Sequence, residues 1–196
     1  MTEPACETPL PTVLLRSVLW RRRDEPSFEL ARFREYHDGF ILEGRVLTVF
    51  GDEPCEVHYS VWCGLDWSTR GADVFVMDGR EPRRLVLRRD DEDHWWREGT
   101  HHLPELDGLR DIDLAVSPAT NTLAIRRLAL QPGESAGAEA AWVRFPELTL
   151  ERIPQRYTRT SERHYHYESG DFAADLEVDD QGVVIHYGEL WERVAP

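Results

Sequence analysis

The chain has 196 residues and a formal net charge of −14, with 31% charged and 41% hydrophobic residues. This length is enough for one sizeable hydrophobic core, and the composition is typical of a folded, soluble domain. The negative electrostatic potential of such a chain repels phosphate backbones, which argues against nucleic-acid binding. Aromatic residues make up 10% of the chain and include seven tryptophans, which favours a β-rich core or an aromatic-lined cavity.

The first eleven residues are polar and rich in proline, so we predict a mobile tail over 1–11 and a single β domain over 12–196. No secretory signal and no apolar run of the ~18 residues needed to span a membrane is visible. We therefore expect a cytoplasmic protein that does not insert into a membrane. The cysteines are few and odd in number, which predicts free thiols at Cys6, Cys55 and Cys63.

Short segments of alternating polar and apolar residues predict a series of hairpins along the first half of the chain. We expect strands over 13–22, 27–35, 40–50, 55–66, 72–77, 84–89 and 94–98. The dipeptides Asp38-Gly39 and Asp78-Gly79 are strong signals for hairpin turns. Gly44 lies inside the third strand and indicates a bulge or a close approach of another group to the backbone.

The segment 111–130 changes character abruptly. Its first residues alternate as a strand, and Ser117-Pro118 then ends the strand because proline has no N–H to donate. Residues that often cap helices follow, namely Thr120, Asn121 and Thr122. We predict a strand, a cap, and a short helix that runs back over a sheet.

After this helix, residues 131–138 are rich in glycine, serine and alanine and predict a flexible loop. Further strands are expected over 139–146, 147–153, 155–160, 164–169, 171–178, 183–189 and 191–194. Hairpins spaced by about ten residues are typical of an all-β sandwich or barrel. We therefore predict a mainly β fold with one helix, in which closure or strong curvature of the sheet removes exposed edges.

Several motifs resemble one bacterial family. They include Asp111-Ile-Asp-Leu, Thr120-Asn-Thr-Leu and Arg126-Arg-Leu, with flanking matches over 59–67, 142–146, 155–157, 165–167 and 182–187. Together they resemble the putative glycolipid-binding family, formerly a domain of unknown function, although Ala124 replaces the proline usual there. The resemblance implies a strongly curved, barrel-like antiparallel sheet wrapped around a single helix. It also implies remote similarity to lipoprotein-localisation factors, a homodimer and an acidic pocket.

Carboxylates in or beside strands are the first candidate ligand-binding groups, namely Glu43, Asp66, Asp78, Asp111 and Asp113. If several of them face one concave surface, crowding raises a carboxylate pKa and supplies acceptors for sugar hydroxyls. Asp66 is the strongest single candidate, because Trp67 beside it offers an aromatic platform. The alternative is that these carboxylates face solvent or pair with the abundant arginines.

Arg126 and Arg127 are the candidate cationic groups. Either side chain could bind a carboxylate or phosphate of a ligand through its guanidinium fork. The alternative, which we favour from the sequence, is an internal ion pair with Asp111 or Asp113.

No catalytic residue, metal ligand or cofactor motif is predicted. His164 and His166 share one face of a strand, but Tyr165 and Tyr167 look like core residues, so the histidines should face solvent. The chain has no Walker A or dinucleotide-binding motif.

The leading hypothesis is a protein that binds a small-molecule glycolipid or sugar in an acidic pocket beside an apolar groove. A structural or regulatory homodimer without a ligand is the first alternative. A carboxylate-dependent enzyme acting on glycoconjugates is the second, and it would need two carboxylates about 5–10 Å apart.

Overall fold

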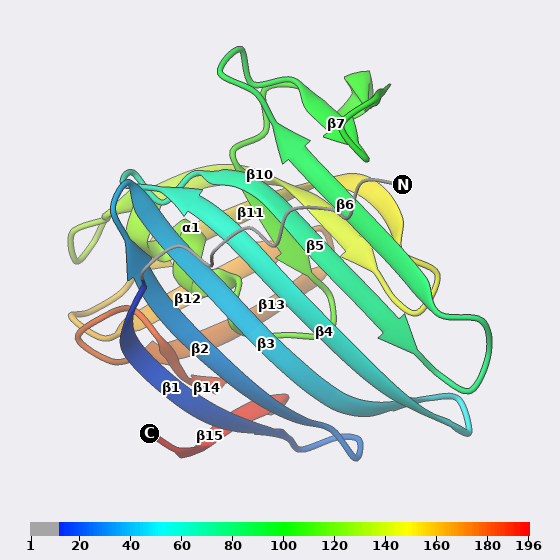
Figure 1. Cartoon of the computed structure of the whole chain (residues 1–196). Helices are drawn as coiled ribbons and strands as arrows, with labels where there is room; N and C mark the ends of the chain where they lie inside the picture. Colours follow the sequence, from blue (N-terminus) through cyan, green and yellow to red (C-terminus); the bar gives the residue numbers. More distant parts are fainter. Residues whose placement is uncertain (1–11) are drawn as a thin grey trace.

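The computed structural model describes residues 12–196, and the tail predicted over 1–11 lies outside the described residues. The described chain forms one 15-stranded sheet, one α-helix, α1 (Asn121–Leu128), and a short 3-10 turn, η1 (Pro104–Leu106) (Figure 1). The prediction of a mainly β protein with one helix is confirmed.

Of the nine strands that precede the helix, the first eight form one half of the sheet and the ninth lies at the opposite edge. They are β1 (Val13–Arg22), β2 (Phe28–Tyr36), β3 (Gly39–Phe50), β4 (Glu53–Gly64), β5 (Thr69–Met77), β6 (Arg83–Arg89), β7 (Trp95–Arg97), β8 (His101–His102) and β9 (Asp111–Leu114). The strands that follow it are β10 (Ser135–Arg144), β11 (Thr149–Arg159), β12 (His164–Ser169), β13 (Phe172–Val178), β14 (Val184–Tyr187) and β15 (Trp191–Ala195).

The sheet is a meander in which most neighbouring strands are also consecutive in the chain. The exception is the antiparallel pair β1–β15, which brings the first and last strands together inside the sheet. The strands β9 and β10 are consecutive in the chain, but they pair in parallel and have α1 in their connection. A parallel pair needs such a crossover, because a tight turn cannot bring the chain back to the same end of the sheet.

The sheet is open. Its two edges are β8 and β9, which do not pair with each other in the part of the chain that the structure describes. The predicted barrel-like closure and strong curvature of the sheet are therefore wrong. These edge strands have only two and four residues, so they offer too short a ladder to join the edges. The chain between them passes through η1, and the Trp95 indole donates to the Leu109 carbonyl at 2.9 Å beside it.

The helix and the segment before it contact both halves of the sheet. Figure 1 shows β1 to β6 on the near side of α1 and β10 to β13 on its far side. On the near side, Ser117 donates to Glu29 of β2 at 2.7 Å. On the far side, the Tyr157 hydroxyl of β11 donates to Asn121 Oδ1 at 2.9 Å. The predicted packing of the helix against the sheet is confirmed.

Gly44 illustrates how tightly this interior is packed. A Cβ placed on Gly44 would lie 2.2 Å from the ring of Tyr59 on the neighbouring strand. The close approach predicted from this interior glycine is confirmed, because no side chain fits between β3 and the ring.

Three local predictions are corrected. Residues 135–138, predicted as a loop, pair with 155–158 as the start of β10. The strands predicted over 147–153 and 155–160 form one strand, β11, that runs through Pro154. The missing N–H of Pro154 is tolerated because pairing of β11 with β12 begins only at Arg156. Thr120 precedes the helix in αR geometry and makes no side-chain capping bond.

Candidate functional site

The predicted acidic residues do not converge on one hollow. Asp66 precedes β5 and Asp78 follows it, and β5 has nine residues. At roughly 3.3 Å per residue the strand separates the two side chains by roughly 30 Å. An acidic pocket formed by all five carboxylates is therefore not present.

Three of these carboxylates bind neighbouring groups instead. Glu43 accepts from Arg34 at 2.8 Å, and the buried Asp78 accepts from Arg83 at 2.6 Å, which lowers the pKa of Asp78. Asp66 is exposed and accepts from the backbone and hydroxyl of Ser68, at 3.1 and 2.6 Å. The structure does not assign a ligand to any of the three.

Asp111 and Arg127 form the internal ion pair that the sequence favoured. Two donors of the guanidinium reach the two oxygens of the buried carboxylate, at 2.8 and 2.6 Å. This bonding raises the pKa of Arg127 and ties the end of α1 to β9.

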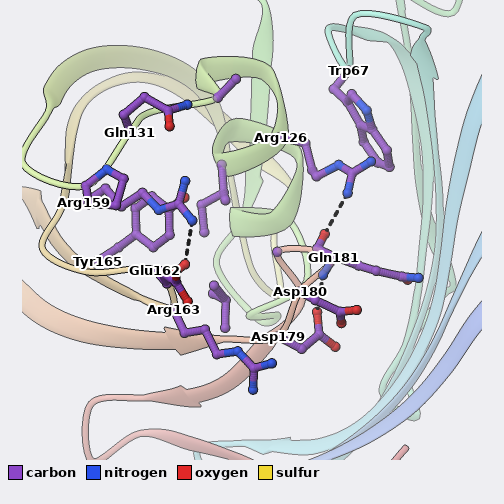
Figure 2. Close-up of a pocket in the computed structure, with 15 residues that line it drawn as sticks. Trp67, Arg126, Gln131, Arg159, Glu162, Arg163, Tyr165, Asp179, Asp180 and Gln181 are labelled. Carbon is purple, nitrogen blue, oxygen red and sulfur yellow. Dashed lines mark hydrogen bonds between the residues drawn. The ribbon is translucent and has the colours of Figure 1, made fainter.

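Trp67 and Arg126 come together at a broad hollow of about 690 Å³, which we call the Arg126 pocket (Figure 2). The Trp67 ring stacks on Phe40 with centroids 4.0 Å apart, and the Arg126 guanidinium lies 4.7 Å from the Trp67 ring. Arg126 also donates to the Gln181 carbonyl at 3.2 Å. Trp67 has a positive φ of 65°, in the left-handed region, in the turn between β4 and β5.

Most of the strong hydrogen-bonding groups deep in the Arg126 pocket already have protein partners. Arg159 donates to the carbonyls of Leu130 and Glu162, and Asp179 accepts from Arg193 at 2.7 Å. The other charged side chains that line it, Glu162, Arg163 and Asp180, are exposed. Small-molecule sites are usually more apolar, with a few well-placed polar groups. This hollow is therefore the weaker candidate.

A second hollow fits that description better. It has a volume of about 290 Å³, and we call it the aromatic cavity; six of its lining residues are Asp113, Trp142, Tyr167, Phe172, Tyr187 and Trp191. The rings of Tyr167, Phe172 and Tyr187 pack edge to face, with centroids 5.9 to 6.2 Å apart. Such packing fixes the rings and gives the cavity stable aromatic walls.

Asp113 is the one carboxylate among the residues that line the aromatic cavity. Its Oδ2 accepts from Gln155 at 2.5 Å, and its Oδ1 has no hydrogen-bond partner within residues 12–196. Burial raises the pKa of Asp113 to about 6, the Gln155 bond opposes this shift, and nearby Asp111 adds to it. The cavity thus offers an acceptor oxygen that is free to bind a ligand.

Sequence reasoning identified Asp113 but missed the aromatic residues around it. Tyr167 was predicted as core, and Trp142 and Tyr187 were placed in strands with no functional role. Each of the three lies in a different strand, β10, β12 or β14, and alternation within one strand shows only which face of that strand a residue occupies. It does not show that the three strands surround one cavity.

The remaining predictions concern histidines and cysteines. His164 is exposed as predicted and His166 is half-buried, with Asp175 2.8 Å from its ring nitrogen. Within residues 12–196, no group of three or more potential ligands could hold a metal ion. Cys55 and Cys63 are buried free thiols, as predicted, and Cys6 lies outside the described residues. No helix within 12–196 is long and apolar enough to cross a membrane.

An open, mostly antiparallel sheet with one short helix, and an aromatic cavity that holds one carboxylate, define a β protein with a hollow of small-molecule size. Residues 17–193 match the family described as "Putative glycolipid-binding", and the chain belongs to this family. It is also similar to the crystal structure of a DUF1089 family protein from Pseudomonas aeruginosa, with 34% identity and a TM-score of 0.79. That similarity covers 89% of this chain and 95% of the other. None of the curated proteins matches the chain.

Proposed function

We propose that this protein binds a glycolipid and that the aromatic cavity holds the sugar head group. The observation that carries the proposal is the free Oδ1 of Asp113 in a cavity walled by aromatic rings. Sugars present apolar C–H faces that pack on aromatic rings and hydroxyls that donate to carboxylates. Membership of the family supports the same class of ligand.

The size and surroundings of the cavity fit a small head group. Its volume of about 290 Å³ is near the lower end of the roughly 300–1,000 Å³ found for small-molecule sites. Phe172 lines the cavity and is 42% exposed, so it offers apolar surface where an attached acyl chain can leave. Tyr187 also lines the cavity, and its hydroxyl is a candidate donor for a second sugar oxygen.

A single carboxylate at this cavity also bears on the enzyme hypothesis. Glycoside hydrolysis uses two carboxyl groups on opposite sides of the scissile bond. Asp113 has no second carboxylate facing it among the residues that line the cavity. The cavity therefore supports binding rather than hydrolysis by a carboxylate pair.

The proposal includes a cytoplasmic homodimer. Two buried, unpaired cysteines are typical of proteins kept in a reducing compartment. Apolar side chains at the start of β1, Val13 and Leu14, are 64% and 49% exposed and offer surface that a second copy could cover. Light scattering coupled to gel filtration measures the mass in solution, and a monomer at all concentrations would contradict this part of the proposal.

Calorimetric titration with octyl β-glucoside below its micelle concentration tests the binding function. The informative variant is Trp142→Ala, and Trp62→Ala is its matched control. Both tryptophans are half-buried, and each has an arginine guanidinium 5.0 Å from its ring, but only Trp142 lines the cavity.

We expect Trp142→Ala to weaken binding about tenfold, which corresponds to about 1.4 kcal/mol. Trp62→Ala should bind like the unmodified protein. No heat with any alkyl glycoside, or an equal loss in both variants, would refute the proposal.

A further inference from the structure

We propose that the head group bound in the aromatic cavity carries a positive charge, as an amino sugar or a lipid ammonium group does. The inference rests on the proposed function and names the chemistry of its ligand. It follows from a carboxylate that has no cationic partner inside a cavity walled by aromatic rings.

The protein does not neutralise Asp113. Its hydrogen-bond partner is the neutral amide of Gln155. Arg127, which lies near this end of β9, is bound through two donors to Asp111. Asp113 is half-buried, and a carboxylate held partly away from water is costly to leave without a cation.

Arg22 is the one cationic side chain among the residues that line the cavity, and it is also occupied. Its guanidinium lies 2.8 Å from Asp24 and 2.5 Å from Glu25. The same group lies over the Trp191 ring, 5.8 Å from the centroid. Two carboxylates already balance its charge, so Arg22 does not compensate Asp113.

The aromatic walls favour a cation for a second reason. The face of an aromatic ring carries negative electrostatic potential, and several rings around one carboxylate form a cage that attracts ammonium groups. Tyr167, Phe172 and Tyr187 provide these rings around Asp113, whereas the Trp142 and Trp191 rings already have the Arg144 and Arg22 guanidinium groups over them. A neutral sugar would pack on the rings but leave the carboxylate charge uncompensated, whereas a protonated amine satisfies both.

The test compares three octyl sugars by calorimetry at pH 7, below their micelle concentrations. Octyl β-glucosaminide carries the amine, octyl β-glucoside replaces it with a hydroxyl, and the N-acetylated glucosaminide keeps the nitrogen without its charge. We expect the glucosaminide to bind at least about tenfold more tightly than the other two, about 1.4 kcal/mol. This comparison uses the unmodified protein, so it does not depend on the folding of a variant.

Two variants then assign the preference to Asp113. Asp113→Asn keeps the shape of the side chain and an oxygen that can accept from Gln155, so we expect it to fold and to lose the preference for the glucosaminide. Asp171→Asn is the control, because Asp171 is exposed and adjoins Phe172 without lining the cavity. It removes the same charge nearby and should keep the preference.

The outcomes separate the inference from the function on which it rests. Equal or tighter binding of the neutral glucoside overturns the inference and leaves the proposed function standing. No binding of any sugar overturns both. Octyltrimethylammonium is the last probe: if it binds as tightly as the glucosaminide, the cation belongs to a lipid ammonium group, and if it binds weakly, an amino sugar is the ligand.

Discussion

Glu29 provides the sharpest prediction about stability. The side chain is fully buried in β2, and its Oε1 accepts from Ser117 at 2.7 Å and from the Tyr59 hydroxyl. Its Oε2 has no partner in the described part of the chain. Burial raises the pKa of Glu29 from 4.5 to about 7, although the two hydrogen bonds oppose the shift.

The sign of the effect on stability follows from these values. Between about pH 4.5 and 7 the folded protein holds a proton on Glu29 that the unfolded chain has released. The free energy of unfolding therefore falls as the pH rises through this window and changes little above it. At about 1.4 kcal/mol for each pH unit, the loss comes to roughly 3 kcal/mol.

Glu29→Gln removes this titration and preserves the shape of the side chain. Urea unfolding followed by tryptophan fluorescence at pH 5 and pH 8 measures both proteins. We expect the stability of the variant relative to the unmodified protein to increase by roughly 3 kcal/mol between the two pH values. Glu35→Gln is the control, because Glu35 is exposed on the same strand. If the difference between Glu29→Gln and the unmodified protein is the same at both pH values, the reasoning is wrong.

Two further predictions concern packing. Arg127→Ala leaves the buried carboxylate of Asp111 without its cation, so we expect a loss of roughly 3 kcal/mol in urea unfolding, and a loss no larger than that of Arg126→Ala would contradict this. Gly44→Ala forces a methyl group against the Tyr59 ring and should cost roughly 1–3 kcal/mol in thermal unfolding. Gly137→Ala, whose added Cβ would lie 3.9 Å from its nearest neighbour, should melt close to the unmodified protein.

The sequence predicted the hairpins well because their signals are local. The strand predicted over 164–169 is β12 at both bounds, since a polar turn flanks it and its tyrosines and histidines alternate. The open edge could not be predicted in this way. Whether β8 and β9 pair depends on their lengths and on the path of the chain between them. Neither can be predicted from the local pattern of residues.

The site shows the same limit. Asp66 was the strongest candidate because Trp67 follows it, but adjacent residues at a turn need not face the same way. Trp67 stacks on Phe40, while Asp66 binds Ser68. The burial of Glu29 was not predicted, because one glutamate in an alternating strand is indistinguishable from a surface residue until its buried neighbours are known.

The pairing of β1 with β15 has a consequence for how the molecule is made. Hairpins can form as the chain leaves the ribosome, but the β1–β15 pair needs the first and the last strand of the sheet. Contacts between such distant residues are slow to form, because a long loop must close before they stabilise anything. Until Trp191–Ala195 is synthesised, the growing chain holds β1 as an unpaired edge, and the last five-residue strand both completes the sheet and covers that edge.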